Sequence, residues 1–182
     1  MFIFRTDNPD VIGFEPQVFS DERGFLMESY RRDKFIQAGI PHEFVQDNHS
    51  CSIKGTLRGL HYQISHVQGK LVWVISGEIF DAAVDLRKSS PNFGKWVGLI
   101  LSAENKKQLW IPPGFAHGFY TLSPQADILY KTTDYYNPTG ERCLIWNDPF
   151  INITWPLDHQ VPPLLSEKDK RGASFKNTEV FE

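Results

Sequence analysis

The chain has 182 residues, of which 41% are hydrophobic and 14% are aromatic, which is enough apolar material for one sizeable core. We therefore expect residues 1–182 to form a single domain. A formal net charge of −3 and a pI near 6.1 provide no general attraction to phosphate backbones, which argues against nucleic acid as a partner.

The amino-terminal residues lack the features of a targeting segment. Residues 1–7 contain no basic region followed by a long apolar run, and Asp7 and Pro9 interrupt the apolar residues that are present. No stretch approaches the roughly 18 consecutive apolar residues that a membrane span needs. Cys51 and Cys143 form no CxxC pair, so we interpret both as buried or half-buried thiols. We expect a cytoplasmic protein with no membrane partner.

The predicted elements are short and mostly strands. In chain order, the first is a helix over residues 31–38, because Gly39 and Pro41 supply stop signals. Runs rich in β-forming residues, separated by turn residues, then predict strands. These cover residues 71–75, 79–86, 96–101, 108–111, 118–122, 128–133, 142–146 and 151–155.

Three further signals complete the expected architecture. Residues 112–114, Pro-Pro-Gly, force a bend because neither proline can donate to a ladder. Residues 166–169 have the form of a capping box, which predicts a short helix. Strands at this spacing favour an all-β, cupin-like jelly roll with a few short peripheral helices and a cavity between its sheets.

Polar residues that could carry chemistry gather in residues 46–50, 55–63, 113–119 and 130–136. Each cluster also has a purely structural interpretation. Histidines in strands are more often hydrogen-bonded structural residues, and tyrosines pack well on half-buried sheets. Asp169 could serve only as the acidic member of the capping box.

A metal centre is a separate hypothesis, because small β-barrels with two histidines often bind iron, manganese or zinc. Such a site requires His-x-His followed closely by a carboxylate, with a further histidine on a later strand. Here residues 61–63 read His-Tyr-Gln, so the second ligand is missing, and Glu78 and His117 alone are too few. We therefore predict no metal.

Nine stretches, taken together, resemble the dTDP-4-dehydrorhamnose 3,5-epimerase family, a branch of the cupin-like jelly rolls. They follow one another in the order found in the family and span most of the chain. The stretches are FSDERGF (19–25), QDNHS (46–50), LRGLHYQ (57–63), QGKLV (68–72), VDLR (84–87), IPPGFAHGF (111–119), YK (130–131), WNDP (146–149) and LSEKD (165–169).

The resemblance implies a homodimer that needs neither metal nor cofactor and acts on a dTDP-linked 4-keto-6-deoxy sugar. By matching position, His61 is the general base and Asp169 is the carboxylate that orients it. Lys70 stabilises the enolate oxygen, and Tyr136 is the acid on the opposite face. The other matched positions contact the substrate: Phe19, Arg23, Glu28, Gln46, Asn48, Arg58, His117, Tyr130 and Lys168.

These residue types suit the implied chemistry. A hydrogen beside a ketone is weakly acidic, so its removal needs a base poised near pH 7 and a cation at the developing enolate oxygen. Inversion also needs a second proton donor across the ring. Tyr136 meets this need if it lies on a strand separate from that of His61, as we expect in a jelly roll.

Three alternatives stay open at this point. The first is an epimerase that acts on one carbon, or on a related nucleotide-linked keto sugar. The second is a metal-dependent cupin enzyme, and the third is a sugar-binding module without catalysis. Trp73 also departs from the family pattern, because an arginine is common at that position.

Overall fold

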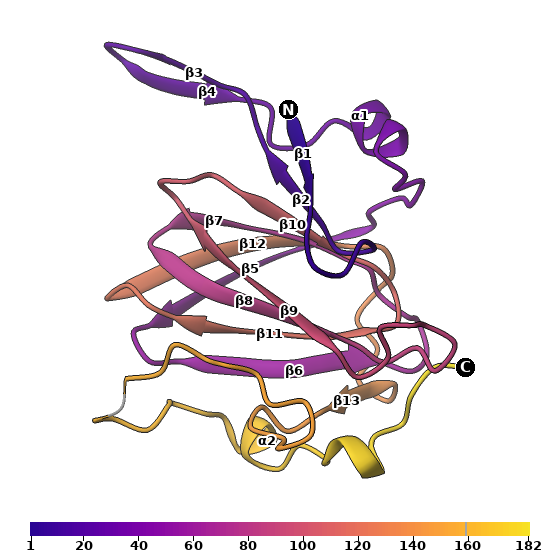
Figure 1. The fold of residues 1–182 in the computed structure, drawn as a ribbon. Coiled ribbons are helices and arrows are strands. Elements are labelled where there is room, and N and C mark those ends of the chain that lie inside the picture. Colours follow the sequence, from indigo (N-terminus) through magenta and orange to yellow (C-terminus); the bar gives the residue numbers. More distant parts are fainter. Residues whose placement is uncertain (159) are drawn as a thin grey trace.

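The computed structural model describes residues 1–158 and 160–182, and strands dominate this part of the chain (Figure 1). The strands are β1 (Phe2–Arg5), β2 (Ile12–Glu15), β3 (Val18–Asp21), β4 (Gly24–Met27), β5 (Gln46–Ile53), β6 (Leu57–Gln63), β7 (Lys70–Ser76), β8 (Glu78–Asp85), β9 (Trp96–Ser102), β10 (Gln108–Ile111), β11 (Phe115–Thr121), β12 (Gln125–Thr132) and β13 (Glu141–Cys143). The helices are short: α1 (Arg32–Gln37), α2 (Glu167–Lys170) and the 3-10 helix η1 (Phe175–Asn177).

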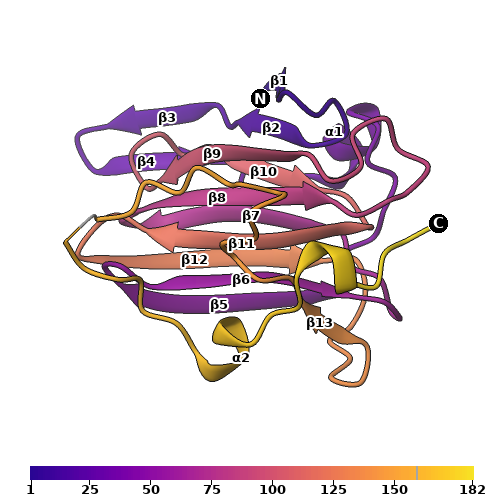
Figure 2. The same ribbon diagram turned by 60° about the horizontal axis from the view of Figure 1, so that its bottom comes forward.

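Two antiparallel sheets lie face to face, which confirms the predicted jelly roll (Figure 2). One sheet has the strand order β1-β2-β10-β7-β12-β5, and the other has the order β13-β6-β11-β8-β9. Neighbours in these sheets are mostly distant in sequence, so the pairing is largely non-local. Alternate residues of each strand therefore point either between the sheets or outward.

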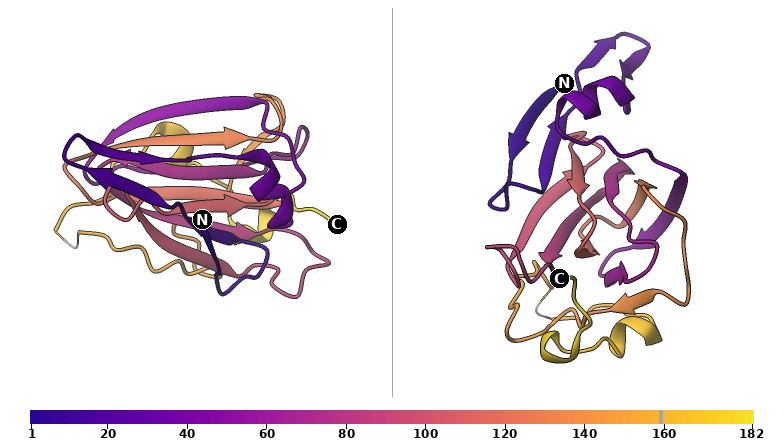
Figure 3. Two further views of the ribbon diagram at one scale, coloured as in Figure 1. Left: turned by 90° about the horizontal axis from the view of Figure 1, so that it is seen from above. Right: turned by 90° about the vertical axis from the view of Figure 1, so that its right-hand side faces the viewer.

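Apolar side chains fill three layers rather than one. The layer between the sheets includes Val72, Ile79, Leu101 and Ile128, all almost fully buried. A second layer joins the outer face of the β13-β6-β11-β8-β9 sheet to the C-terminal segment. A third joins the outer face of the other sheet to α1 and the N-terminal strands. The N- and C-terminal segments thus cover opposite sides of the sandwich (Figure 3).

The hairpin β3–β4 projects from the body as an arm (Figures 1 and 3). Its apolar residues Phe19, Phe25 and Leu26 are 58%, 57% and 74% exposed. A soluble chain rarely exposes several large apolar side chains on one short hairpin unless another surface covers them.

Most predicted elements are confirmed, with shifted ends. Helix α1 lies within the predicted 31–38, and Ser166 caps α2 by accepting a hydrogen bond from the Asp169 N–H. Strands β11 and β12 each begin three residues earlier than predicted, and β13 ends at Cys143 rather than at residue 146. The described part of the chain contains no helix that is long and apolar enough to cross a bilayer.

The predicted strand over residues 151–155 is wrong. Ile151, Ile153 and Trp155 are buried and alternate with exposed residues, because they pack on the outer face of the β13-β6-β11-β8-β9 sheet. The segment itself joins no ladder. Asn152 has a φ of 51°, which breaks the extended conformation that a strand requires. Cys51 is also exposed, contrary to the prediction that both thiols are at least half-buried.

Trp73, which departs from the family pattern, lies on the outer face of β7. It is 7% exposed and packs in the layer that includes Phe14, Phe35 and Trp110. Because strand residues alternate in direction, Trp73 points away from the space between the sheets. Its role in this fold is to hold the N-terminal segment on the sandwich.

A fully buried carboxylate, Asp85, ties together the loops at the end of β8. Arg87 donates to it from its backbone N–H, Nε and Nη2, and Ser90 donates from Oγ at 2.7 Å. Arg87 also reaches Asp10 in the N-terminal loop. Burial alone would raise the pKa of Asp85, but these hydrogen bonds outweigh burial and lower it.

We predict that Asp85→Asn lowers the free energy of unfolding by about 2–3 kcal/mol at pH 7, because it removes a charge that several buried donors require. The folded pKa is below the unfolded value of about 3.9, so the contribution is complete at neutral pH and disappears as the pH falls through the folded pKa. Urea denaturation at pH 7 and at pH 3 measures both effects.

Asp47→Asn is the matched control, because the Asp47 side chain is 67% exposed and pairs with Lys131. It should change stability by less than about 1 kcal/mol. A destabilisation by Asp85→Asn that is equally large at both pH values would contradict the assignment of the effect to the charge.

Candidate functional site

A cavity of about 340 Å³ lies between the two sheets, and polar side chains line most of it. Its lining comes from β5, β6, β7, β11 and β12, together with the loop after β12, β13 and α2. The lining residues are Gln46, Asn48, Ser50, Arg58, His61, Tyr62, Gln63, Gln68, Lys70, His117, Gly118, Phe119, Tyr130, Tyr136, Glu141 and Lys168.

Because side chains alternate in direction along a strand, alternate residues of the β1-β2-β10-β7-β12-β5 sheet point into the cavity. Gln46, Asn48 and Ser50 are spaced by two along β5, so all three point into the cavity. Tyr130 lies opposite Asn48 on β12, and Lys70 begins β7. The structure therefore brings together four of the residues that the sequence predicts for this wall.

The opposite wall depends on an irregular pairing of β6 with β11. His117 pairs with His61, but the register shifts before Phe119 pairs with Arg58. A Cβ on Gly59 would lie 2.5 Å from the Cα of Gly118, so the two backbones approach too closely for any side chain there. This irregularity lets Arg58 and His61 face the same cavity although they are three residues apart.

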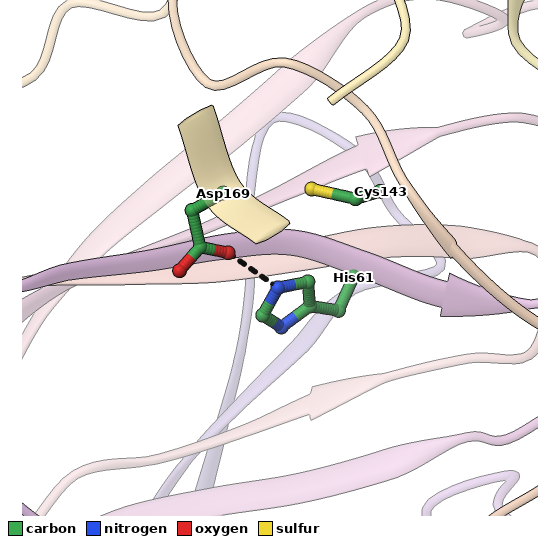
Figure 4. Close-up of side chains that lie close together, drawn as sticks. All are labelled: His61, Cys143 and Asp169. Carbon is green, nitrogen blue, oxygen red and sulfur yellow. Dashed lines mark hydrogen bonds and ion pairs between the residues drawn. The ribbon is translucent and has the colours of Figure 1, made fainter. Parts of the chain in front are cut away.

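His61 and Asp169 form a hydrogen-bonded pair at the edge of the cavity, with 2.6 Å between His61 Nε2 and Asp169 Oδ1 (Figure 4). The other ring nitrogen, Nδ1, points away from Asp169. Asp169 Oδ1 also accepts from the Gly59 N–H at 3.2 Å, and Ser166 Oγ donates to Oδ2 at 2.6 Å. The predicted base and its carboxylate are thus in direct contact.

The environment assigns different charges to these two groups. Burial alone would raise the pKa of Asp169, but the hydrogen bonds from His61, Ser166 and Gly59 lower it to about 2. Burial lowers the pKa of His61, and the positive charges of Lys168 and Lys70 lower it further. The hydrogen bond and the charge of Asp169 act in the opposite direction but do not outweigh these effects. At neutral pH the imidazole is therefore in the neutral form that a base requires, beside an ionised carboxylate.

Lys70 reaches the cavity beside His61, with its Nζ 3.4 Å from the His61 carbonyl oxygen. Burial lowers the pKa of Lys70 to about 8, although the carboxylates of Asp81 and Glu141 oppose the shift. The ammonium is therefore mostly protonated at neutral pH. It provides a positive charge inside the protein, where charge interactions are stronger than in bulk water.

Tyr136 lines the cavity, but it does not lie on a strand as predicted. Strand β12 ends at Thr132, and the chain then turns at Asp134, whose carboxylate accepts from the Tyr135 N–H. Tyr136 follows in the loop, and its own N–H donates to Gln46 Oε1 at 2.9 Å. A side-chain contact from β5 therefore replaces the ladder that a strand would have provided.

The carboxylate of Glu141 holds two side chains at the rim of the cavity, which the sequence did not indicate. Tyr136 donates its phenol hydrogen to Glu141 at 3.1 Å, and Lys168 donates to the other oxygen of Glu141 at 2.8 Å. Partial burial and the Glu141 charge raise the pKa of Tyr136, so the phenol keeps its proton at neutral pH. Glu141 begins β13 after a polar stretch of sequence, and a glutamate there gives no sequence signal of such a role.

Gln63 is a second residue whose role only the structure reveals. It is buried, its Nε2 donates to the carbonyls of His66 and Tyr135, and its Oε1 accepts from the Asn137 N–H. These bonds join the loop after β6 to the loop that carries Tyr136. Gln63 thereby positions Tyr136 without touching its ring.

His117 forms another pair, with 2.8 Å between its Nε2 and Asp81 Oδ2. Both residues are buried, and His117 lines the cavity as predicted. Asp81 was not predicted, although it interrupts an apolar strand and such an isolated carboxylate is a usable signal. The second oxygen of Asp81 has no hydrogen-bond partner among the described residues.

Three predicted substrate contacts are not at this cavity. Phe19 and Arg23 lie on the arm, and Glu28 follows it. Arg23 is paired with Asp21 and has 84% of its side chain exposed, while Phe19 and Glu28 border a separate hollow at the base of the arm. The isolated chain therefore presents these side chains away from His61.

The metal-ligand pattern considered above is not assembled, because Glu78 does not line the cavity that contains His117. Within residues 1–158 and 160–182, one group of three candidate ligands lies close together, formed by His61, Cys143 and Asp169 (Figure 4). The half-buried state of Cys143 confirms the prediction that this thiol is buried or half-buried.

Comparison with known proteins gives a consistent result. The family model described as dTDP-4-dehydrorhamnose 3,5-epimerase matches residues 5–177. A relative of that name from Pseudomonas aeruginosa is 61% identical over 174 residues, which is 95% of each chain. A crystal structure of dTDP-6-deoxy-D-glucose-3,5-epimerase from Legionella pneumophila, in complex with dTDP-4-keto-L-rhamnose, is 50% identical with a TM-score of 0.95. That match covers 98% of this chain and 94% of the other.

A more distant match is a 3'-monoepimerase from Streptomyces bikiniensis in complex with dTDP-quinovose. It is 31% identical with a TM-score of 0.86, over 93% of this chain and 86% of the other. The similarity to the two 3,5-epimerases is therefore higher than the similarity to this single-carbon enzyme.

Proposed function

This chain belongs to the dTDP-4-dehydrorhamnose 3,5-epimerase family, and we propose that it inverts C3 and C5 of dTDP-4-dehydro-6-deoxy-D-glucose to form dTDP-4-dehydro-L-rhamnose. The observation that carries the proposal is the His61–Asp169 pair at a cavity that Lys70 also enters. A neutral imidazole beside a cation suits proton removal next to a ketone. We place this activity in one domain, residues 1–182, in the cytoplasm.

The first step is removal of a carbon-bound proton by His61. Because Nε2 faces Asp169, the free nitrogen Nδ1 is the atom that accepts the proton. Asp169 holds the ring orientation and stabilises the imidazolium that forms, as in other carboxylate–histidine pairs. The electron pair of the broken C–H bond moves to the 4-keto oxygen and gives an enolate.

Lys70 is the group that stabilises the enolate. Its ammonium is mostly protonated at neutral pH, since the pKa of Lys70 is about 8. A fixed cation in a protein cavity lowers the energy of a developing negative charge more than the same cation in solvent does.

Tyr136 delivers a proton to the opposite face of the ring, which completes the inversion. Its phenol is protonated at neutral pH and is held by Glu141. After transfer, the imidazolium carries one extra proton and the phenolate lacks one, so a proton must pass between them through solvent before the second carbon reacts. The exposure of Tyr136 at the rim supports such an exchange.

The remaining polar residues suit recognition of the sugar nucleotide. Arg58 is held by Ser52 Oγ and the Cys51 carbonyl and offers its guanidinium fork to diphosphate oxygens. The sugar and diphosphate contacts that we propose within the cavity are Gln46, Asn48, Arg58, His117, Tyr130 and Lys168. Binding these remote parts would position the reacting carbons near His61.

We predict that the wild-type protein in heavy water incorporates deuterium at both C3 and C5 of dTDP-4-keto-6-deoxyglucose, observed by NMR. His61→Ala should slow incorporation at both carbons by roughly 10²- to 10⁴-fold, because it removes the base. His49→Ala is the control, because His49 lies on the outer face of β5 and pairs with Asp127.

Deuterium at one carbon only would replace this proposal with that of a single-carbon epimerase. Incorporation in His61→Ala at the wild-type rate would assign the base to another residue. Circular dichroism of each variant separates loss of the base from loss of the fold.

We predict that Tyr136→Phe separates proton removal from inversion. The variant should still exchange the C3 proton through His61, but product should form roughly 10²- to 10³-fold more slowly, because the opposite face has lost its proton donor. NMR of the sugar protons measures exchange and configuration in the same sample. Tyr135→Phe changes the neighbouring exposed phenol and should have no such effect, and equal product rates for both variants would exclude Tyr136 as the acid.

A homodimer would explain the position of the arm. Phe19, Arg23 and Glu28 are predicted to contact the substrate, yet in the isolated chain they point away from the cavity. In a two-fold symmetric dimer each arm can reach the pocket of the other protomer. The exposed apolar side chains of the arm, Phe25 and Leu26 among them, support burial against a second copy.

We predict that two defective variants complement each other. Arg23→Ala loses an arm contact and His61→Ala loses the base, so each alone should be weakly active. Co-expression with random pairing makes about half of the dimers mixed, and each mixed dimer has one pocket with both residues intact. Activity should rise to about one quarter of the wild-type value, whereas an arm that serves its own pocket would give no gain.

A further inference from the structure

Cys143 lies directly beside the proposed base. It pairs with His61 across strands β13 and β6, so the two side chains leave the sheet on the same face. The Cys143 Sγ, a His61 ring nitrogen and an Asp169 carboxylate oxygen all lie within 4.8 Å of one another (Figure 4). The thiol is half-buried, does not line the substrate cavity, and takes no part in the proton transfers above.

The three side chains offer one sulfur, one nitrogen and one oxygen ligand. This mixed set suits a borderline-soft divalent cation such as Zn²⁺, which commonly takes three protein ligands and leaves a fourth position open. A thiolate and a carboxylate together would match the charge of the ion. The positive charges of Lys168 and Lys70 act on His61 and oppose a cation there, and the bond of Lys168 to Glu141 partly neutralises Lys168.

We propose that His61, Cys143 and Asp169 bind one Zn²⁺-class cation and that the bound ion inhibits the enzyme. The inhibitory half of this inference rests on the proposed role of His61 as the base. The binding half stands on the arrangement of the three ligands alone.

Modest side-chain movement would complete the site. Bonds of about 2.0–2.3 Å to a tetrahedral ion place neighbouring ligand atoms roughly 3.5 Å apart. The 2.6 Å contact between His61 and Asp169 must therefore open by about 1 Å, and Cys143 must approach by a similar distance. Within the described residues the Cys143 thiol makes one hydrogen bond, a long one of 3.7 Å to the Leu144 carbonyl, so little hydrogen bonding opposes rotation of the side chain.

A bound metal ion would inhibit the enzyme because it changes which ring nitrogen of His61 carries the proton. When the ion occupies Nε2 of His61, the proton of that nitrogen moves to Nδ1, and Nδ1 can no longer accept a proton from the substrate. The half-buried Cys143 thiol must lose its proton to become a zinc ligand. Binding therefore releases one proton, from sulfur, and forms the Zn–S bond.

The first experiment detects the ligands without any substrate. Co²⁺ added to the full-length, chelator-treated protein should produce a near-ultraviolet thiolate-to-cobalt charge-transfer band. The band should appear in the wild type and in Cys51→Ala, whose altered thiol is exposed and does not belong to the three-ligand group, and it should be absent in Cys143→Ala. No band in the wild type, or an unchanged band in Cys143→Ala, would overturn the site.

The second experiment measures inhibition of deuterium exchange by Zn²⁺, with each protein compared with its own metal-free rate. The Zn²⁺ concentration for half inhibition should be on the order of tenfold or more higher for Cys143→Ala than for wild type and Cys51→Ala, because one of three ligands is lost. Equal sensitivity of all three proteins would contradict inhibition through this site. If no protein exchanges deuterium at all, the proposed function fails, while the cobalt spectra still decide the metal site.

Discussion

The buried carboxylate of Asp169 is the constraint on which the site depends. It comes from the C-terminal segment, yet its hydrogen-bond donors are His61 and Gly59 on β6 and Ser166 before α2. An ionised carboxylate is costly to bury unless such donors surround it, so α2 and β6 are held in one relative position. The apolar layer between the C-terminal segment and the outer face of the sheet supplies the packing energy for that position. The apolar packing that stabilises the fold thus also orients the base, His61.

Burial, hydrogen bonds and neighbouring charge then set the protonation states of four groups at the site. Asp169 is ionised and His61 neutral, while Lys70 and Tyr136 carry their protons at neutral pH. A base, a cation and an acid can coexist within one small space because each has a different partner. The backbone of β6 orients Lys70, and Glu141 holds the phenol. Loops contribute as much as strands here, since Gln63 links the two loops that flank the rim.

The short distances that orient His61 also allow a metal ion to compete for its ring nitrogen. A carboxylate, an imidazole and a thiol within reach of one ion form a potential metal site even when the reaction uses no metal. The side chains of Cys143, His61 and Asp169 lie close together, with their ligand atoms within 4.8 Å of one another (Figure 4). The arm shows the opposite arrangement, since Phe19 and Arg23 are kept far from the cavity of their own chain. A second copy is the simplest way to bring such residues to a pocket.

Local sequence patterns indicated part of the elements and the chemical family. β-forming runs and turn residues indicated β7 to β10, stop signals indicated α1, and Ser166 indicated α2, because each of these depends on neighbours in the chain. Ordered motifs identified the family and the pair His61 and Asp169. Only the tertiary structure decided that residues 151–155 stay outside the sheets, that Tyr136 lies in a loop and that Cys143 adjoins His61. Those outcomes depend on strand register and on packing between segments far apart in sequence, which no local pattern encodes.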